Sequence, residues 1–375
     1  MSKKVLYVAS VEDHLLAFHV PYLRMLKDKG FEVHTATSGE NKIPFVDRHF
    51  SIPFTRQPLT LQNLRAYREL KAVLDGGGYT FVHCHTPAAS FVTRFAARKA
   101  RKAGTKVIYT AHGFHFYDGG PKLRCFVFRT MEKFASRFTD VILTINDEDY
   151  RALSRYHFKN RQSFLTKGVG FDASRFTPPA PGEKERLRTE FGIPEGSFVL
   201  IFPAELNRGK NQAELLRAVQ LLQSRMPDLL LLLPGEGTAE DELKALAVQL
   251  DVANRVRFLG QRGDVDKLLK ASDIDVTASR REGLGMHIVE AMASGLPVVA
   301  TRIRGHAETV RDGENGFFYT SGNTAELAER IAQMAELAHN PQEWEHMRQC
   351  CVETAEPFRL ESALKRMEEI YDAIL

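Results

Sequence analysis

Short β-rich runs alternate with helical patterns along the whole 375-residue sequence, and this alternation limits the chain to a small group of folds. In the first half, strands are expected at residues 4–10, 32–38, 81–86, 106–112 and 140–146, with helices at residues 18–29 and 61–74. In the second half, strands are expected at residues 198–205, 229–234, 256–260, 273–279 and 297–301. Strands that alternate with helices pair in parallel through right-handed crossovers. The sequence therefore predicts an α/β protein with doubly wound parallel sheets.

The length of the chain indicates two domains, because 375 residues exceed what a single ordinary core holds. Between the two halves, Pro178, Pro179, Pro181 and Gly182 disfavour any regular element. We place the boundary here, which gives an N-terminal domain of residues 1–175 and a C-terminal domain of residues 176–375. The last stretch, residues 360–375, has a helical pattern and could pack on the C-terminal domain or back on the N-terminal one.

The composition is that of a soluble globular protein, with 43% apolar residues. The apolar run at residues 229–233 is far shorter than the roughly 20 residues of a membrane helix. The first residues contain no long apolar signal region. The four cysteines have no metal-ligand spacing, and a disulfide between the adjacent Cys350 and Cys351 would be strained. We therefore expect a cytoplasmic protein with reduced thiols.

The most informative segment is residues 279–299, SRREGLGMHIVEAMASGLPVV. Its pattern is a strand end, a loop with Gly283 and Gly285, a helix, and a proline before the next strand. Glycines let a ligand approach the backbone closely, and free amides at a helix start attract phosphate. Glu282 in the loop can accept hydrogen bonds from sugar hydroxyls, and Glu290 on the helix is placed for a diol such as a ribose. Alternatively, both are solvated glutamates of an ordinary strand–loop–helix connection.

This glutamate pair, with seven residues between Glu282 and Glu290 in a glycine-bearing context, resembles the retaining GT-B glycosyltransferases of family four. The resemblance spans nearly the whole chain and includes residues 4–10, 169–172 and 308–316. The stretches TAHGFHF (110–116) and TINDEDY (144–150) resemble the bacterial capsule and exopolysaccharide branch. The family fold is two facing doubly wound, Rossmann-like domains with an interdomain cleft. The C-terminal domain is then expected to bind the nucleotide sugar.

The resemblance also implies individual roles around the glycine loop. Glu282 is expected to contact the donor hexose and Glu290 the nucleotide ribose, with Gly283, Leu284 and Gly285 in the donor-binding loop. It implies retention of configuration through a front-face route, in which the leaving diphosphate helps to deprotonate the acceptor. No side chain in the sequence is an obvious covalent nucleophile.

A second segment, FPAELNRGKNQ at residues 202–212, follows the first strand of the C-terminal domain. A cation there can neutralise the diphosphate leaving group, in place of a metal ion. The family usually carries an arginine in this loop and a lysine five residues later. Lys210 matches the lysine, whereas Glu205 stands at the arginine position and leaves open whether Arg208 is the second cation. The alternative for Lys210 and Arg208 is an ordinary surface role.

Histidines follow the strand at residues 106–110, at His112 and His115. A histidine at a strand end is more often structural, but two of them with flanking aromatics indicate a sugar-contacting loop. The resemblance implies that His112 faces the reacting sugar, through a hydrogen bond or its backbone carbonyl. The first loop lacks the glycine-rich turn of many relatives, so Asp13 and His14 either meet the acceptor hydroxyl or cap the following helix.

Two weaker features complete the candidate residues. Arg262 follows the strand at residues 256–260 and lines the nucleobase by the same resemblance, or lies in an ordinary loop. His83 and His85 could ligate a metal, but no acidic cluster accompanies them, and alternation on a buried strand explains their spacing. We expect no cofactor and no metal ion.

Basic and aromatic residues interleave at helical spacing over residues 122–138. Such a helix can dip its aromatic side into lipid while its cations meet anionic headgroups. The alternative is a core helix whose phenylalanines pack on the sheet. Nucleic-acid binding uses similar residues, but no nucleic-acid fold signature accompanies them.

These expectations combine into a metal-independent glycosyltransferase that moves a hexose or N-acetylhexosamine from a nucleotide sugar, UDP-linked, to a hydroxyl. The expected acceptor is a lipid-pyrophosphate-linked saccharide at the inner membrane face, where the enzyme would be peripheral, as in capsule or exopolysaccharide assembly. A sugar-nucleotide 2-epimerase shares the fold but lacks this glutamate pair in its glycine loop. A catalytically degenerate scaffold or regulatory subunit is the other alternative, raised by Glu205 and the absent glycine-rich turn.

Overall fold

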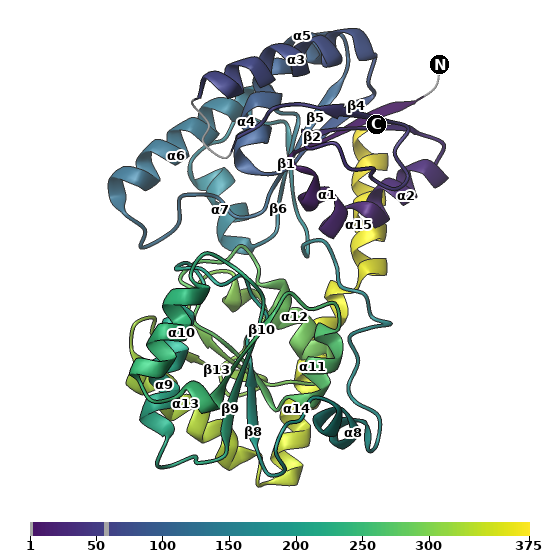
Figure 1. Ribbon diagram of the computed structural model, residues 1–375. Helices are drawn as coiled ribbons and strands as arrows, with labels where there is room; N and C mark the ends of the chain where they lie inside the picture. The colour runs from purple at the N-terminus through teal and green to yellow at the C-terminus, as the bar shows by residue number, and fades with distance from the viewer. Residues whose placement is uncertain (1–2, 56–59) are drawn as a thin grey trace. The chain divides into compact units, whose positions relative to one another are not determined.

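The computed structural model describes residues 3–55 and 60–375, which form two compact units (Figure 1). The first unit contains Met1–Gly170 and Glu361–Leu375, and the second contains Phe171–Leu360. Residues 171–175, assigned from the sequence to the first domain, thus belong to the second unit. Phe171 explains this, because its backbone amide and carbonyl bond to Phe358 and Leu360.

The first unit is built on a seven-stranded sheet in which neighbouring strands pair in parallel. The strand order is β3-β2-β1-β4-β5-β6-β7, so the order reverses between β1 and β4. Ligands of doubly wound sheets bind at the carboxyl ends of the strands, beside this point of reversal. The strands are β1 (Lys4–Val11), β2 (Glu32–Ser38), β3 (Arg48–Ser51), β4 (Phe81–Cys84), β5 (Lys106–Ala111), β6 (Val141–Thr144) and β7 (Gln162–Leu165).

Helices of the first unit connect these strands and pack on the sheet. The core under them joins strand residues such as Leu6 and Val82 to helix residues such as Leu70 and Val92. The helices are α1 (Glu12–Phe18), α2 (Val20–Asp28), α3 (Leu61–Gly77), α4 (Pro87–Ala96), α5 (Arg98–Lys102), α6 (Lys122–Ala135), α7 (Asp147–Arg155) and α15 (Leu360–Ile374), with the 3-10 turn η1 (Ser136–Phe138).

The second unit repeats the design with a six-stranded parallel sheet of order β10-β9-β8-β11-β12-β13. Here the order reverses between β8 and β11, which predicts a ligand site at their carboxyl ends. The strands are β8 (Phe198–Ile201), β9 (Leu229–Pro234), β10 (Val256–Gly260), β11 (Ile274–Thr277), β12 (Val298–Thr301) and β13 (Gly316–Tyr319). The helices are α8 (Glu183–Glu190), α9 (Gln212–Leu222), α10 (Glu240–Gln249), α11 (Val265–Ala271), α12 (Met286–Ala293), α13 (Thr324–Leu337) and α14 (Pro341–Ala355), with the 3-10 turns η2 (Ala253–Arg255), η3 (His306–Glu308) and η4 (Glu356–Phe358).

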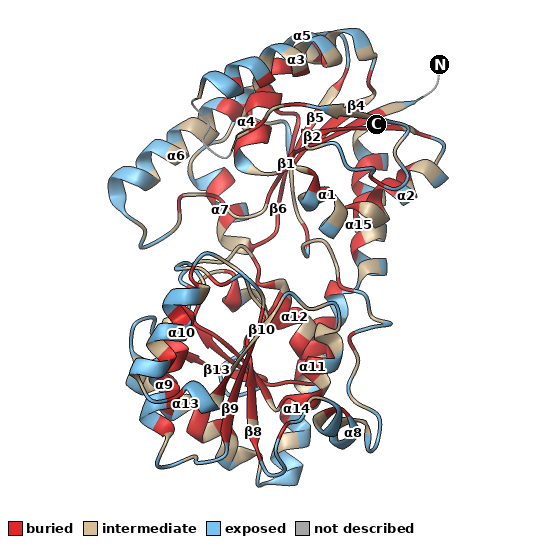
Figure 2. Ribbon diagram, viewed as in Figure 1, coloured by how far each residue is buried: buried red, intermediate tan, exposed pale blue. Residues whose placement is uncertain are grey.

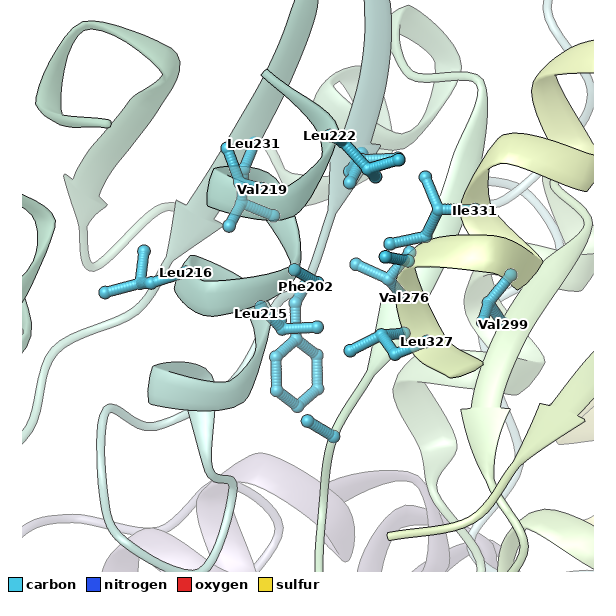
Figure 3. Packing of buried hydrophobic residues seen from close by; sticks show 14 of the residues in the cluster. Phe202, Leu215, Leu216, Val219, Leu222, Leu231, Val276, Val299, Leu327 and Ile331 are labelled. Carbon is cyan, nitrogen blue, oxygen red and sulfur yellow. The ribbon is translucent and has the colours of Figure 1, made fainter. Parts of the chain in front are cut away.

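One apolar cluster holds α9 and α13 against this second sheet (Figure 3). Leu215, Val219 and Leu222 recur at helical spacing on α9, which places them on one face of the helix. Ile331 of α13 and Val276 of β11 belong to the same cluster. The strands of this sheet other than β10 are almost entirely buried, as the red ribbons of Figure 2 show. This packing fixes the strand ends that carry the loops of the candidate site.

The ten strands expected from the sequence are present, with bounds that agree within a few residues. The prediction of an α/β protein with two doubly wound sheets is therefore confirmed. Three further strands, β3, β7 and β13, were not expected. Each of them lies at an edge of its sheet.

The last helix, α15, packs into the first unit although most of the second unit precedes it in the sequence. Its buried residues Ala363, Met367, Ile370 and Tyr371 fall on one face. The Tyr371 ring stacks on Phe81, with ring centroids 4.8 Å apart.

The helix α6 is exposed over much of its length, since Ala135 is its one fully buried residue. Leu123 is 78% exposed and Phe126 is 57% exposed, so the alternative of a core helix is wrong. Phe128 on the other side is partly buried against the core. Over the described parts of the chain, no helix is both long and apolar enough to cross a membrane. Cys84, Cys125, Cys350 and Cys351 are free thiols.

Candidate functional site

Two loops of the second unit meet at the carboxyl ends of β8 and β11, where the strand order reverses. The first loop runs from β8 to α9 and carries Lys210. The second runs from β11 to α12 and carries Glu282. A backbone hydrogen bond joins them, donated by the Arg280 amide to the Gly209 carbonyl at 2.9 Å. The Arg280 guanidinium also donates to Asn211 Oδ1 at 3.2 Å.

Lys210 and Glu282 form an ion pair across these two loops, with Lys210 Nζ 2.6 Å from Glu282 Oε1. The lysine side chain is 25% exposed and the glutamate side chain 15%. Both charges are thus accessible from one side and held in place by their mutual contact. The structure brings together two of the residues predicted to be catalytic.

Glycines shape the loop that carries Glu282. Gly285 precedes α12 with a φ of 82°, in the left-handed region that side chains disfavour. A Cβ on Gly305 would lie 2.8 Å from the Glu282 carbonyl oxygen, so the neighbouring segment can approach because Gly305 has no side chain. The first-turn amides of a helix have no acceptor within the helix, and they favour an anion. Gly283, Leu284 and Gly285 therefore lead into a helix start of the kind that favours an anion.

Glu290 lies on α12 and faces a partly buried environment. Burial raises the pKa of its carboxyl to about 7, and Arg175 partly offsets this rise. Arg175 is held by Asp266 and by the Gly263 carbonyl, each at 2.9 Å. Near neutral pH, Glu290 can therefore exist with or without its proton.

Beneath these loops lies a set of buried polar residues that the sequence reasoning did not select. Both carboxylate oxygens of Asp275, in the middle of β11, are buried and have no hydrogen-bond partner among the described residues. His287 Nε2 is 3.9 Å from Asp275 Oδ2. Burial raises the pKa of Asp275 well above its usual value and lowers the pKa of His287. Burial thus disfavours the charged form of both side chains.

His306 supports the same loop from the turn after β12. Its Nδ1 lies 2.9 Å from the Thr301 carbonyl, and the Thr301 hydroxyl donates to the Ser279 carbonyl at 2.6 Å. Burial lowers the pKa of His306 to about 4, which disfavours the charged form of this side chain as well. The chain Ser279–Thr301–His306 positions the start of the glutamate loop.

The first unit gathers the candidate acceptor-side residues at the carboxyl ends of β1, β4 and β5. His112 directly follows β5, and His14 lies on α1, which begins immediately after β1. Their ring centroids are 5.1 Å apart. Asp13 is exposed on α1, and neither Asp13 nor His14 caps that helix, because its cap position, Val11, makes no side-chain bond.

Two more histidines, His19 and His85, adjoin His14 and His112 in the first unit, and His115 does not belong to this group. One ring nitrogen from each of the four lies within 4.8 Å of the others. These four residues are called the histidine cluster below. His115 instead packs against Phe128 of α6, with ring centroids 5.0 Å apart.

Comparison with known proteins identifies the family. Residues 22–204 match the family described as Glycosyltransferase Family 4, and residues 183–349 match the one described as Glycosyl transferases group 1. EpsD of Bacillus subtilis (strain 168), named as a glycosyltransferase, is 43% identical over 375 residues, which cover 100% of this chain and 98% of EpsD. The chain belongs to glycosyltransferase family 4.

Further relatives of this glycosyltransferase carry more specific names. One from Escherichia coli, named UDP-Gal:alpha-D-GlcNAc-diphosphoundecaprenol alpha-1,3-galactosyltransferase, is 27% identical over 72% of this chain and 70% of its own length. The crystal structure of Anabaena Alr3699/HepE in complex with UDP-glucose aligns with a TM-score of 0.79 at 22% identity, covering 99% of each chain. With its two parallel-sheet, Rossmann-like domains, the glycosyltransferase has the GT-B fold.

Two predicted donor-binding arginines of the glycosyltransferase, Arg208 and Arg262, form ion pairs with carboxylates other than Glu282. The Arg208 side chain is 86% exposed and pairs with Glu242 of α10 at 3.4 Å. It lines a cavity of about 500 Å³ together with Arg217 and Arg280. Arg262 pairs with Asp264 at 2.6 Å. In this arrangement Arg208 does not join Lys210 as a second cation beside Glu282.

Proposed function

We propose that this glycosyltransferase moves a hexosyl or N-acetylhexosaminyl unit from a UDP-sugar to a hydroxyl of a lipid-pyrophosphate-linked saccharide, with retention of configuration and without a metal ion. The observation that carries the proposal is the contact between Lys210 and Glu282 at the head of α12. It combines a cation for a diphosphate, a carboxylate for sugar hydroxyls and a helix start for a phosphate in one place.

The donor diphosphate binds between Lys210 and the first turn of α12 in this proposal. Negative charge grows on the leaving oxygen as its bond to the anomeric carbon breaks. A fixed cation and helix amides aimed at that oxygen stabilise the transition state more than the bound donor. Lys210 therefore supplies the positive charge that a metal ion supplies in other transferases.

The remaining roles follow from the chemistry of each side chain. Glu282 accepts hydrogen bonds from the hydroxyls of the transferred sugar, and Glu290 accepts from the ribose. Both are carboxylates, and hydrogen bonds to charged acceptors are stronger than those to neutral ones. In the first unit, His112 contacts the reacting sugar, and Asp13 and His14 are the acceptor-side candidates.

The chemical step is a front-face displacement. The electron pair of the bond between the anomeric carbon and the diphosphate stays on the diphosphate oxygen. That oxygen accepts the proton of the acceptor hydroxyl, and the acceptor oxygen bonds to the anomeric carbon on the face that the leaving group vacates. The new glycosidic bond keeps the configuration of the donor.

A lipid-linked acceptor is supported by the name of the Escherichia coli relative and by the exposed apolar side of α6. Leu123, Phe126 and Phe134 are exposed there, beside the exposed cations Lys122, Arg124 and Arg137. A hollow of about 730 Å³ in the same unit adds further positive charge, lined by Lys71, Arg98, Lys99, Arg101, Lys102, Arg137 and Arg161. Apolar side chains with flanking cations favour an anionic membrane surface. The enzyme is therefore proposed to act as a peripheral protein on the inner face of the cytoplasmic membrane.

The proposal is tested by product analysis after a thermal-shift panel of nucleotide sugars has identified the donor. A donor that binds the folded state raises the melting temperature by mass action. With a lipid-pyrophosphate saccharide present, the enzyme should release UDP and form a glycoside whose anomeric configuration, read by NMR, matches the donor. Interconversion of sugar nucleotides without acceptor would indicate a 2-epimerase. Donor binding without any turnover would indicate a scaffold.

A further inference from the structure

Four histidines from separate segments of the first unit converge in the histidine cluster. His14 lies on α1, and His19 lies between α1 and α2. His85 follows β4 and His112 follows β5, so these two stand at the carboxyl ends of adjacent strands. Three regions far apart in the sequence thus bring the four imidazoles to the same place, with His14 and His19 coming from one of them.

The distances within the histidine cluster match those between the ligands of one metal ion. His14 Nε2 and His19 Nε2 are 3.3 Å apart, and His85 Nδ1 and His112 Nε2 are also 3.3 Å apart. Four nitrogens at 2.0–2.1 Å around a tetrahedral Zn²⁺ are separated by about 3.3–3.4 Å. The remaining pairs of ligand nitrogens lie within 4.8 Å of one another. Side-chain rotations that shorten these distances by about 1–1.5 Å would give the spacing of a tetrahedral site.

The His85 ring is 1% exposed, and outside the histidine cluster it has no hydrogen-bond partner among the described residues. By contrast, both nitrogens of the neighbouring His83 are used, by Tyr371 and Thr110 at 2.7 Å each, and His83 is not part of the site.

We propose that His14, His19, His85 and His112 bind one borderline transition-metal ion, with Zn²⁺ as the expected ion. Imidazole ligands suit Zn²⁺, Co²⁺, Ni²⁺ and Cu²⁺, whereas Mg²⁺, Ca²⁺ and Mn²⁺ prefer oxygen. The partly exposed His14 and His112 give the ion a route of entry from solvent. The bound ion ties the α1–α2 segment to the ends of β4 and β5.

This site shares His14 and His112 with the acceptor-side candidates and has no residue in common with the proposed diphosphate site. It lies in the first unit, whereas Lys210 carries the charge of the donor diphosphate in the second. Ligation through Nε2 of His112 leaves its backbone carbonyl available to a sugar. In this proposal His85 is a metal ligand, whereas the sequence analysis explained its spacing from His83 by alternation along a buried strand.

The test is metal binding to the intact protein, measured with the metal alone. Purified, chelator-treated protein should bind one equivalent of Co²⁺ with the visible absorption of a tetrahedral site, and Zn²⁺ should displace it. Zn²⁺ should also raise the melting temperature, because it binds the folded state. His14→Gln and His19→Gln should each weaken Zn²⁺ binding by more than the roughly 10–100-fold that follows loss of an outer-shell partner.

A matched control separates this site from adventitious binding. His346 is exposed on α14 and lies 3.8 Å from Cys350, a pair that could also hold a soft ion. The His346→Gln variant should still bind one equivalent of Co²⁺. If a cluster variant fails to fold, the wild-type Co²⁺ spectrum still decides, since thiolate ligands add intense near-ultraviolet bands and imidazoles do not. The proposal would be overturned if the protein bound no stoichiometric Co²⁺, if the spectrum showed thiolate bands, or if binding survived both His14→Gln and His19→Gln. The cluster would then be only a hydrogen-bonded histidine network.

Discussion

Lys210 Nζ and Glu282 Oε1 are 2.6 Å apart, although their loops belong to different βα units of the second sheet. The pair places a positive charge and a carboxylate side by side in the loops before α9 and α12. Before the donor binds, the ion pair holds both side chains in position. A donor diphosphate that binds Lys210 must then compete with Glu282 for the lysine.

Replacing Lys210 with Ala should lower turnover more than donor affinity. Charge on the diphosphate grows as the glycosidic bond breaks, so the cation is worth more in the transition state. The expected loss in kcat is about 10²–10³-fold, as for removal of one transition-state donor. Kinetics at saturating donor measure kcat, and calorimetry measures donor affinity. Lys244→Ala, which removes a lysine from an exposed pair with Glu240 on α10, is the control. A rise in the Michaelis constant alone would reduce Lys210 to a binding residue.

Replacing Glu290 with Ala should weaken binding of the bare nucleoside diphosphate. The ribose hydroxyls would lose a charged acceptor, which is worth about 1.5–3 kcal/mol. Calorimetry should be done at a pH well above 7, where the wild-type carboxyl is ionised. Glu326→Ala, which removes a carboxylate near the start of α13, controls for the change in net charge. Unchanged affinity in Glu290→Ala would make this glutamate a structural residue.

The pH dependence of nucleotide binding should report the same carboxyl. Burial raises the pKa of Glu290 to about 7, so its acceptor form is populated as the pH rises through that value. Affinity should therefore increase with pH across neutrality. The nucleotide phosphate titrates as well, so the measured quantity is the difference between wild type and Glu290→Gln. Parallel pH profiles for the two proteins would contradict the assignment.

Transfer should not require Mg²⁺ or Mn²⁺, because Lys210 supplies the positive charge at the diphosphate. Turnover after exhaustive chelation should not rise when either ion is added. If chelation also removes an ion from the histidine cluster, Zn²⁺ or Co²⁺ should refill that site and Mg²⁺ or Mn²⁺ should not, because imidazole and oxygen ligands select different metals. Activity that disappears with chelator and returns with Mn²⁺ or Mg²⁺ would refute the lysine-based chemistry.

Membrane association should depend on the exposed side of α6. Arg124 and Arg137 are exposed, whereas Arg129 is partly buried over the Tyr156 ring at 4.4 Å. Arg124→Gln with Arg137→Gln should lower partitioning onto anionic liposomes roughly thirtyfold, at about 1 kcal/mol for each cation. Co-sedimentation measures this effect, and high salt should imitate it.

The exposed apolar side chains of α6 are tested with a separate variant. Phe126→Ser should weaken the binding that salt does not remove, and Leu221→Ser, at a residue 57% exposed on α9, is the matched control. Equal partitioning of wild type and both sets of α6 variants would exclude this helix as the membrane contact. Circular dichroism confirms that each variant is folded.

The three strands that the sequence patterns missed all lie at sheet edges, although the predicted strand β10 is an edge strand as well. Interior strands such as Leu229–Pro234 are apolar throughout, because neighbours and helices cover them on all sides. The missed strands β3, β7 and β13 are edge strands, and β3 and β7 are only partly buried. A partly buried edge strand needs fewer apolar residues, so the sequences of β3 (RHFS) and β7 (QSFL) resemble those of loops.

Candidate residues could be selected from the sequence where a segment carries a recognisable motif, as for Lys210, Glu282 and Glu290. The glycine loop placed Glu282 and Glu290 together, and the spacing alone located α12. Asp275 was missed because an acid inside a strand appears as a single exception in an apolar run. The histidine cluster was missed because its members come from three regions of the chain, and only the order of the strands brings them together.

The position of α15 has a consequence for the order in which the chain folds during synthesis. Residues 361–375 complete the first unit, yet the ribosome makes them after all of residues 171–360. Until then, the Phe81 ring and the hydroxyl of Tyr7 lack their partner Tyr371. Domains commonly fold in the order in which they emerge. Here the second unit can finish first, while the first waits for its last helix with part of its core uncovered.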